Sequence, residues 1–392
     1  MKRHLYPLDP ITGEPNRTLT IWEKICSMEN LQLAHKNASR KKRNYKEIIE
    51  VNKDLDTKLK EIQDMLVNRT YEPAPYIKFL REENGKVREI YKSPYFPERI
   101  IQWAVLQVIS PILLKQFIYD TYSAIPDKGI HLALQRVKHD IQTDRFGTAY
   151  CLKMDVRKYY PSVDRDILID DYRRLFKDEG LLWYLEKNIT SAPDTGILIG
   201  NYLSQFGGNY YLSPFDHWLK EVKGIKYYYR YMDDIVILHH SKEYLHELEK
   251  EIIEYFDLYR GLHVKGNYQV FPIADRGLDF VGYRVFPDYV LLRKSTATRL
   301  KSKMIVMKEK VDRGVPLSYS DYCRFNSYAG WLKHCDGHRL YQKYLAPLEQ
   351  SINDYYLTVI KGGKEKHESN GESVLDCETE SSGVRQQSCV SA

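Results

Sequence analysis

The sequence predicts a mixed α+β fold in which antiparallel hairpins are flanked by helices. Three observations lead to this prediction. The chain has 392 residues, enough for a large core and more than one subdomain. Its 43% hydrophobic and 13% aromatic content is typical of a folded globular protein. Amphipathic helical patterns alternate along the chain with short β-rich runs joined by turn residues.

The N-terminal part is predicted to be an arm followed by helices. Residues 1–18 are rich in proline and polar residues. Thr20 and Glu23 have the spacing of a capping box, so a helix is expected to run from here toward Ala38. Residues 39–43 form a basic cluster that either contacts nucleic-acid phosphates or is a solvated helix end. Residues 44–68 have an amphipathic helical pattern.

A hairpin is predicted next, with strands over residues 76–81 and 86–92. Its turn, residues 82–85, contains Asn84-Gly85, which is a strong hairpin signal. Three cations of the returning strand share one face because side chains alternate with a period of two: Lys86, Arg88 and Lys92. Such a face can hold a triphosphate, but the spacing alone favours an ordinary cationic surface.

Residues 97–145 have a helical pattern with a break at residues 126–129. The longest apolar stretch, from Ile100 to Leu114, is interrupted by polar residues and a proline. This interruption indicates a core helix and not a membrane span. The N-terminus lacks an apolar signal region, so a cytoplasmic protein without membrane contact is expected.

The second half of the chain alternates strands and helices. The predicted elements are a strand ending at Asp155, helices over 164–190 and from Asn201, a hairpin over 226–238, a helix over 241–259, short strands over 268–271 and 280–285, a basic helix over 294–310 and a helical segment over 318–360. Beyond Lys361 the tail has no aromatic residue and is rich in Ser, Gly, Glu and Lys, so we expect it to be disordered.

Composition constrains the partners and the compartment. A net charge of +6 suits a polyanionic partner without requiring one, because many enzymes carry such a charge on their surface. The six cysteines lack paired spacing, which indicates reduced thiols in a cytosolic protein. His334, Cys335 and His338 have no second pair at zinc spacing, so a zinc site is not favoured.

The most informative feature is the acidic pair Asp233-Asp234, which follows Tyr231-Met232 between two β-rich runs. Aspartate is an ordinary turn residue, so the pair alone is equally consistent with a plain hairpin. Two carboxylates in contact are costly unless a cation neutralises them, and a divalent metal does this well.

A second acidic segment favours the metal site. Asp155 ends a predicted strand, and the aromatic Tyr160 follows it shortly afterwards. Transfer of a nucleotide to a growing polynucleotide needs two hard cations about 3.5–4 Å apart. Magnesium prefers a few carboxylates together with substrate oxygens. One carboxylate at a strand end and another at a neighbouring hairpin tip meet this requirement.

At these positions the chain resembles a reverse transcriptase. The Asp155 segment is similar to the first catalytic motif of that family and residues 231–234 to its second. The resemblance extends from Trp22 to Leu348, and it implies a right-hand polymerase with an antiparallel palm sheet flanked by helices. The implied divisions are an N-terminal arm and helix over 1–43, fingers over 44–145, a palm with interleaved helices over 146–290, a thumb over 291–360 and the tail over 361–392.

The resemblance also implies roles for individual residues. Asp155 and Asp233 would hold two Mg²⁺ ions, for which Mn²⁺ is a substitute, and Asp234 would be a supporting ligand. The main-chain carbonyl of Val156 is a further candidate ligand. Tyr160 falls on the steric gate, the aromatic that lies beneath the incoming sugar and excludes a 2′ hydroxyl.

Further matches surround this centre. Arg88 aligns with residues of the fingers that contact the triphosphate, and Arg99 matches a family arginine near the start of a helix. Lys265 falls in a segment similar to the motif whose lysine protonates the leaving pyrophosphate. The residues around it depart from the usual run, and a plain surface lysine is the alternative. Residues 277–283 resemble the primer grip, and 294–310 the thumb helix that follows the duplex backbone.

The stretch from Ile199 to Gln205 discriminates among reverse transcriptases. Most members carry Gln-Gly here and end the motif in Ser-Pro, whereas this chain has Ile199-Gly200 and then Gln205 at positions that bind the nucleotide. That form resembles the reverse transcriptases of diversity-generating retroelements, which make errors at template adenines. Residues 127–131 and 327–334 also resemble that subfamily. Isoleucine offers no hydrogen bond, so checking of the incoming nucleotide should loosen; alternatively, Ile199 only packs the following helix.

The resemblance therefore implies an error-prone, adenine-mutagenic RNA-directed DNA polymerase that makes cDNA. Its expected partners are an RNA template, a DNA or RNA primer, deoxynucleoside triphosphates and a basic accessory protein. Two alternatives are a reverse transcriptase of an antiviral defence system and a non-catalytic RNA-binding scaffold with a polymerase fold.

Overall fold

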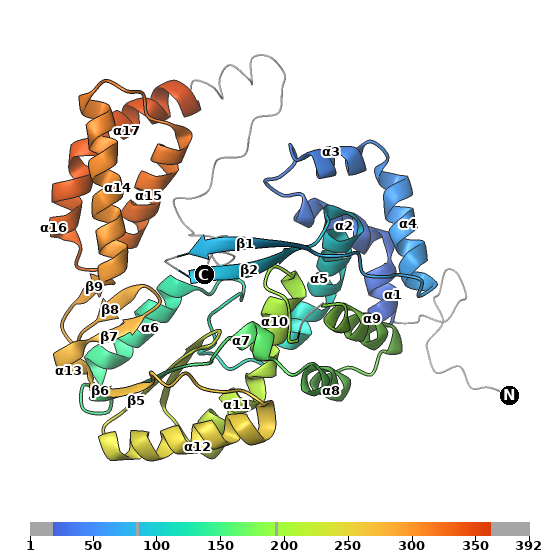
Figure 1. Ribbon diagram of the computed structural model, residues 1–392, viewed down its shortest axis with the longest axis horizontal. Helices are drawn as coiled ribbons and strands as arrows, with labels where there is room; N and C mark the ends of the chain where they lie inside the picture. Colours follow the sequence, from blue (N-terminus) through green and yellow to red (C-terminus); the bar gives the residue numbers. More distant parts are fainter. Residues whose placement is uncertain (1–18, 84–85, 193–194, 362–392) are drawn as a thin grey trace, which may run out of the picture.

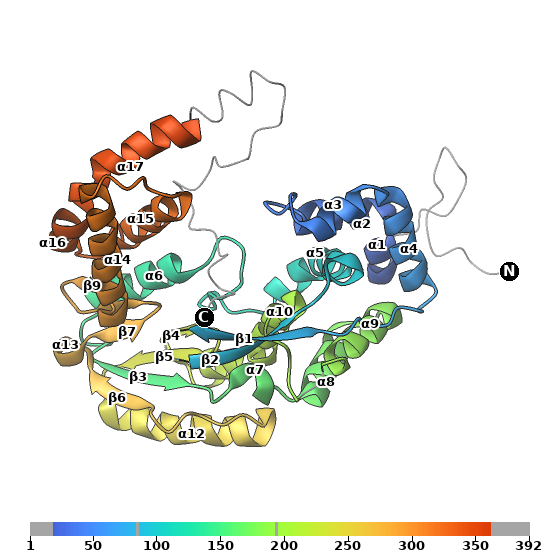
Figure 2. The ribbon, with the colours of Figure 1, turned by 45° about the horizontal axis from the view of Figure 1, so that its top comes forward.

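The computed structural model describes residues 19–361 except 84–85 and 193–194. Helices from the first part of the chain and helices from the last part lie on opposite sides of a long hairpin, and a sheet lies beneath it (Figure 1). The turned view shows the same arrangement (Figure 2). The predicted N-terminal arm, the tail beyond Lys361 and the Asn84-Gly85 pair lie outside the described residues.

The central sheet is antiparallel throughout and has four strands in the order β4-β5-β3-β6. These strands are β3 (Tyr150–Asp155), β4 (Tyr227–Tyr231), β5 (Asp234–His239) and β6 (Gln269–Pro272). The predicted strand ending at Asp155 and the predicted hairpin with its acidic turn are both present. The mixed α+β class with an antiparallel sheet flanked by helices is confirmed.

Apolar residues bury both faces of this sheet. Leu152 and Met154 point to one face and join the larger core cluster. Cys151 points to the other face, where it meets Val236 and Leu238 in a second cluster. Because side chains alternate along a strand, Asp155 leaves β3 on the same face as Cys151. The acid therefore emerges at the edge of the second cluster, where the strand ends.

The N-terminal helices are shorter than the sequence pattern suggested. They are α1 (Ile21–Cys26), α2 (Met28–Ala38), α3 (Lys46–Asn52), α4 (Leu55–Val67) and α5 (Ile100–Leu114). The predicted capping box of Thr20 and Glu23 is present, but the single helix expected to run toward Ala38 is wrong. Ser27 adopts an extended backbone and caps α2 through its side chain, so the helix is interrupted there.

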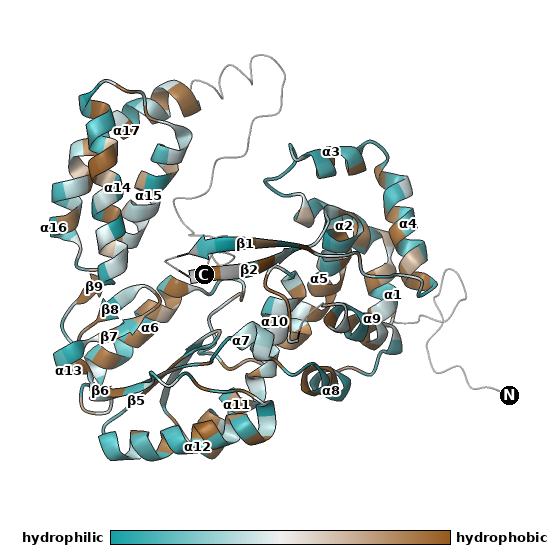
Figure 3. Cartoon of the chain, viewed as in Figure 1, coloured by the Kyte–Doolittle hydropathy of each residue, from teal (hydrophilic) through white to brown (hydrophobic). Residues whose placement is uncertain are grey.

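Helices cover each face of the sheet. The first face packs against α8 (Arg165–Leu175), α9 (Glu179–Thr190), α10 (Tyr202–Tyr211), α11 (Ser213–His217) and α12 (Lys242–Arg260). The second face packs against α6 (Ile130–Thr143) and the C-terminal helices. In Figure 3, α12 shows both hydrophilic and hydrophobic residues, as an amphipathic helix does when one side is buried. The short α7 (Tyr159–Ser162) follows β3.

In the described part of the chain, two further sheets lie outside the central sheet. The hairpin predicted over residues 76–92 is present as β1 (Ile77–Glu83) and β2 (Lys86–Lys92). The single strand predicted over 280–285 is wrong, because the chain turns there and forms a small sheet. Its strands are β7 (Leu278–Phe280), β8 (Tyr283–Val285) and β9 (Val290–Leu292).

The C-terminal part is helical, as predicted, but in several segments. They are α14 (Lys294–Asp312), α15 (Tyr319–Leu332), α16 (His338–Leu340) and α17 (Glu349–Tyr355). Short π-helical segments span Tyr95–Arg99, Trp218–Val222, Tyr341–Leu345 and Tyr356–Lys361, and a short 3₁₀ segment spans Ala346–Leu348. The short helix α13 spans Ile273–Arg276. Cys26, Cys151, Cys323 and Cys335 are free thiols. Across the described ranges, no helix has the length and apolar character needed to cross a membrane.

Candidate active site at the acidic turn

The strand register brings Asp155 and the acidic turn together. Asp155 is paired directly with Asp234 across β3 and β5. Asp233 lies in the tight turn that joins β4 to β5, after Met232, whose φ of 55° is in the left-handed region. Directly paired residues of an antiparallel pair share a face and lie about 4.5–5.5 Å apart at Cα. The three acids predicted from the sequence therefore meet at one end of the sheet.

Asp233 shows the electrostatic consequence of this arrangement. Burial, followed by the neighbouring Asp155 carboxylate, raises the pKa of Asp233 to about 7. A like charge in a poorly solvated site favours the protonated carboxyl. The pKa of Asp234 is also raised by burial, but the ammonium group of Lys153 opposes that effect. The charged neighbours that raise the pKa of Asp233 are thus acids, whereas Asp234 has the ammonium group of Lys153 beside it.

Two lysines lie against these acids. The Lys265 ammonium is 2.5 Å from a carboxylate oxygen of Asp155. The main chain places it there, because the Lys265 amide donates to the Asp155 carbonyl at 2.9 Å next to a bridge between Val156 and Val264. The sequence left open whether Lys265 is a plain surface lysine; the structure brings it to the acidic centre.

Lys153 is a site residue that the sequence reasoning missed. Its ammonium lies 3.1 Å from one carboxylate oxygen of Asp234 and donates to the other at 3.2 Å. It also donates to the main-chain carbonyl of Asp279 in β7. A signal was present in the sequence, since Lys153 and Asp155 occupy alternate positions of one strand and so share a face.

The carboxylates of Asp155 and Asp233 fit a hard divalent cation. Within the described parts of the chain, no group of three or more His, Cys, Asp and Glu side chains is arranged to hold a metal ion. The contact between Asp155 and Asp233 nevertheless has the donor chemistry that Mg²⁺ prefers, and a cation there would relieve the repulsion that raises the pKa of Asp233. Asp234 points instead to Lys153. Two main-chain hydrogen bonds flank the bridge between Val156 and Val264: the Arg157 amide donates to the His263 carbonyl, and the Lys265 amide donates to the Asp155 carbonyl. Neither of them uses the Val156 carbonyl, the further candidate ligand.

The loop that carries Ile199 lies next to Tyr160. The amide of Ile197 donates to the main-chain carbonyl of Tyr160 at 2.9 Å. The half-buried Tyr160 ring stands on α7, edge to face with Tyr159. On its other side the loop meets the β1–β2 hairpin, because the Tyr91 amide donates to the Ile199 carbonyl at 3.0 Å. Main-chain contacts of this loop therefore connect Tyr160, the predicted gate residue, with the segment that carries Ile199, the predicted specificity residue.

Arg99 supports the same loop. Its guanidinium stacks 4.4 Å over the ring of Tyr202 and lies 3.5 Å from the Gly200 carbonyl. Gln205 is half-buried one turn further along α10. Arg88 lies on β2 and pairs with Arg81, but its side chain is outside the described residues.

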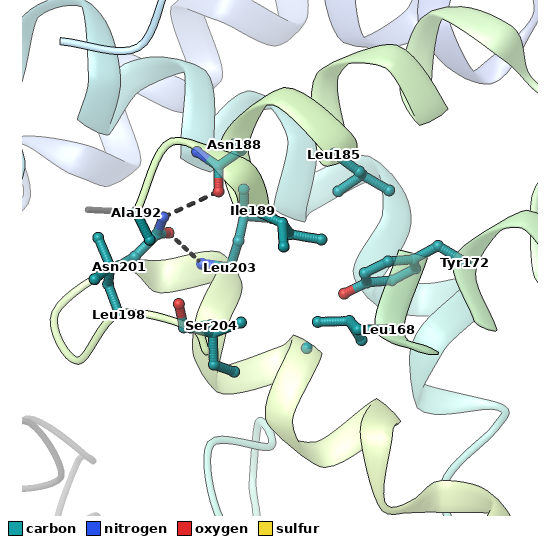
Figure 4. A pocket seen from close by; sticks show the side chains of 12 residues that line it. Leu168, Tyr172, Leu185, Asn188, Ile189, Ala192, Leu198, Asn201, Leu203 and Ser204 are labelled. Atoms are coloured by element: carbon teal, nitrogen blue, oxygen red, sulfur yellow. Dashed lines mark hydrogen bonds between the residues drawn. The ribbon is translucent and has the colours of Figure 1, made fainter. Parts of the chain in front are cut away.

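A small cavity lies behind this loop, between α8, α9 and α10 (Figure 4). Its wall is mostly apolar, and a short chain of hydrogen bonds crosses one side. The Asn201 side-chain amide donates to the Asn188 carbonyl oxygen at 3.0 Å, and the Leu203 amide donates to Asn201 at 2.9 Å. Core side chains such as Leu168 line the rest, so the cavity is a packing gap beneath the loop and not a substrate site.

The predicted primer-grip segment is tied to the acids. Residues 277–283 form the start of the β7–β8 hairpin, and the Asp279 carbonyl accepts from Lys153. The Asp279 carboxylate pairs with Arg293 at the start of α14, at 2.6 Å. Through this chain of contacts, the acidic turn, the hairpin and the basic helix α14 are connected.

Comparison with known proteins identifies the domain that holds these acids. Residues 80–285 match the family described as "Reverse transcriptase (RNA-dependent DNA polymerase)". The chain belongs to the reverse transcriptase family. The match includes Asp155, the acidic turn, Ile199 and the β7–β8 hairpin, so the described site lies in a reverse transcriptase domain, the RNA-directed DNA polymerase of this family. The matched range, residues 80–285, is shorter than the range of the resemblance found in the sequence, which extends from Trp22 to Leu348.

The relatives of this reverse transcriptase are distant. Protein YkfC of Escherichia coli is 27% identical over 179 residues, which are 43% of this chain and 46% of YkfC. The group II intron-encoded protein LtrA of Lactococcus lactis is 24% identical over 183 residues, 43% of this chain and 29% of LtrA. A solved telomerase from Candida tropicalis, in complex with a TWJ fragment of telomeric RNA, has a TM-score of 0.46 at 12% identity and covers 78% of this chain and 58% of its own. The chain thus spans less than half the length of these curated relatives.

Proposed function

We propose that this reverse transcriptase makes cDNA on an RNA template by two-metal nucleotidyl transfer. The observation that carries the proposal is the contact between Asp155 and Asp233 within a domain of this family. Two carboxylates that repel each other in a poorly solvated site favour the binding of a divalent cation, which an ordinary hairpin turn does not require. The proposed substrates are deoxynucleoside triphosphates and a DNA or RNA primer paired with the RNA template.

The roles of the residues follow from their positions. Asp155 and Asp233 would hold Mg²⁺, or Mn²⁺ in its place, with Asp234 and the Val156 carbonyl in support. Bound metal would activate the 3′ hydroxyl of the primer and stabilise charge on the triphosphate. Lys265 would carry a proton near the leaving pyrophosphate. Tyr160 would lie beneath the incoming sugar.

The larger divisions are part of the same proposal. The β1–β2 hairpin with Arg88 would be the fingers over the triphosphate, and the central sheet would be the palm. The helices from α14 onward would be the thumb, whose lysines would neutralise phosphates of the duplex. Residues Gly200 and Gln205 would line the nucleotide site beside Ile199.

We further propose that the enzyme is the error-prone, adenine-mutagenic reverse transcriptase of a diversity-generating retroelement, working with a basic accessory protein. Support comes from Ile199, which stands where most members carry glutamine. Its main-chain carbonyl is already bonded to Tyr91, and its side chain offers no hydrogen bond to a nucleotide. Loss of that contact removes one geometric check on the incoming base.

Primer extension on an RNA template tests the polymerase. Purified wild-type protein should extend a DNA primer in the presence of Mg²⁺ and deoxynucleoside triphosphates. Asp155→Asn should reduce the rate by at least about a hundredfold, because a metal-binding charge is lost. Asp288→Asn is the matched control, since that acid is exposed and pairs with Arg145. Equal rates for wild type and Asp155→Asn would exclude the proposed chemistry.

Sequencing the cDNA tests the subtype. Wild-type errors should concentrate at template adenines, and Ile199→Gln should lower the error rate by about fivefold, because one hydrogen bond is worth about 1 kcal/mol. Ile199→Val is the control for the volume change, and its error rate should stay high. An even, low error rate in the wild type would exclude the mutagenic subtype and leave the polymerase assignment intact.

A further inference from the structure

Arg230 on β4 differs from the other cations near the acidic turn, because it is fully buried. Arg230 and Asp216 of α11 are both 0% exposed, and arginine is almost never fully buried unless it is paired. Building on the proposed function, we propose that Arg230 is a positioning residue: it fixes the peptide between Met232 and Asp233 and so directs the Asp233 carboxylate toward Asp155.

The guanidinium uses all of its donors. Nε and Nη2 donate to the two carboxylate oxygens of Asp216, at 2.7 and 2.5 Å. Nη1 donates to the side-chain oxygen of Asn209 and to the main-chain carbonyl of Met232, each at 3.0 Å. Nη2 also donates to the Asn209 carbonyl at 3.3 Å. The five N–H groups of an arginine are thereby satisfied, and one of them reaches the acidic turn.

The acceptors are themselves fixed. Asp216 also accepts from the Tyr228 hydroxyl at 2.5 Å and from the Thr121 hydroxyl at 3.4 Å. The Asn209 side chain donates to the Ser123 carbonyl at 2.6 Å. Burial opposes the charge, but Asp216 together with Tyr228 and Tyr159 outweighs burial and raises the pKa of Arg230. The guanidinium is therefore a charged, rigid group beneath the turn.

The main chain of Arg230 is fixed as well. Its amide donates to the Asp120 carbonyl at 3.0 Å, and its carbonyl accepts from the Tyr122 amide at 3.1 Å. The side chain and the backbone of the same residue are thus both immobilised. The contact with the Met232 carbonyl is therefore made from a fixed point, two residues away along the strand.

The turn needs such a support. Met232 is a non-glycine residue with a φ of 55°, a conformation that costs free energy and persists only where the surroundings enforce it. The Met232 carbonyl and the Asp233 amide belong to one planar peptide. Holding that carbonyl therefore fixes the direction in which Asp233 leaves the backbone. On the far side the Met232 side chain is packed against α10 at Gly208.

Arg230→Lys tests the positioning role. A lysine keeps the charge beside Asp216, but it lacks the planar fork that reaches Asp216, Asn209 and Met232 together. The Mg²⁺ concentration for half-maximal extension should rise about tenfold and kcat should fall about 10–100-fold, as for other groups that orient metal ligands. KM for the nucleotide should change less than threefold, since the gate and the loop are untouched. Wild-type metal dependence in this variant would overturn the proposal.

Two further variants separate positioning from general stability. Tyr228→Phe weakens the same buried cluster but leaves the contact between Arg230 and Met232, so it should lower the melting temperature and keep the wild-type Mg²⁺ dependence. Arg230→Met combined with Asp216→Leu replaces the ion pair by apolar side chains, which usually preserves folding. This folded double variant should show the raised Mg²⁺ requirement. The opposite pattern in the two variants would contradict the proposed role.

A readout without catalysis completes the test. In protein carrying ¹³C-methyl methionine, the Met232 methyl should give one sharp NMR signal in the wild type and in Tyr228→Phe. Arg230→Lys should broaden or split that signal while the Met304 and Met307 signals stay unchanged. An unchanged Met232 signal would refute the positioning role. Absence of primer extension in the wild type would refute the proposed function alone, because the NMR comparison does not depend on it.

Discussion

At the scale of single residues, the acids of the site and Lys265 could be predicted, but not which acid each lysine contacts. Asp155 and Asp233 stand at a strand end and a hairpin tip, which are visible as local patterns. Lys153 reaches Asp234 through the pairing of β3 with β5, and Lys265 reaches Asp155 through the bridge between Val156 and Val264. Register of that kind depends on packing between distant segments, so no local pattern specifies it.

The pKa of Asp233 leads to a prediction about stability. Its folded value, about 7, lies above the ordinary value of 3.8, so the folded state binds more protons than the unfolded state between these two limits. This contribution to stability is present at low pH and is lost as the pH rises through about 7. Without metal, Asp233→Asn should therefore be more stable than the wild type at pH 8, by about 1–3 kcal/mol, and the difference should vanish near pH 4.

Thermal unfolding with a chelator present measures this difference. Adding Mg²⁺ at pH 8 should raise the melting temperature of the wild type more than that of Asp233→Asn, because binding to the folded state stabilises it. Asp288→Asn provides a control for loss of an exposed acid. If metal-free Asp233→Asn is less stable than the wild type at pH 8, the ionised Asp233 carboxylate does not destabilise the folded state.

At the scale of elements, turn and cap chemistry predicted which helices and strands form but not where each one ends. The capping box at Thr20 and the hairpins were recognised, whereas the break at Ser27 was not. Serine is tolerated inside a helix and favoured as a cap, so its effect at Ser27 depends on how the flanking helices pack. The loop from Gly196 to Gly200 is a similar case, since its position is fixed by contacts with Tyr160 and Tyr91.

Gly200 allows the β1–β2 hairpin to approach this loop. Its φ is 108°, and an added Cβ would lie 2.4 Å from the Tyr91 carbonyl oxygen. Gly200→Ala should therefore separate the hairpin from the loop and raise KM for the nucleotide by about tenfold or more, since strain of this kind costs about 1–3 kcal/mol. Gly330→Ala is the control, because nothing lies within 4 Å of its Cβ position. Equal KM values in steady-state extension would show that the hairpin does not depend on this contact.

At the scale of the whole molecule, the family resemblance implies a division into fingers, palm and thumb, but it does not specify contacts between distant segments. The segments 127–131 and 327–334 were each recognised as similar to the same subfamily, and the structure brings them together. His131 at the start of α6 stacks on His334 after α15, with ring centroids 3.8 Å apart. Trp331 stacks on Tyr283 of β8 at 5.1 Å, and the Tyr283 hydroxyl donates to the Trp331 carbonyl at 3.0 Å. These aromatic contacts join the central sheet region to the C-terminal helices.

This joint should respond to acid. Burial, followed by the neighbouring His334, lowers the pKa of His131 to about 4. The unfolded chain, with an ordinary histidine value of about 6.5, then binds more protons than the folded chain between these limits. Stability is therefore lost as the pH falls from about 6.5 toward 4, by about 1–2 kcal/mol at pH 5.

His131→Phe keeps a ring in the stack but cannot be protonated, so its melting temperature should fall less over this range than that of the wild type. His338→Phe, a change at an exposed histidine, should follow the wild type. Hydrogen exchange at pH 5 should show faster opening of α14 and α15 in the wild type than in His131→Phe, and equal exchange rates would mean that the histidine stack does not control the joint.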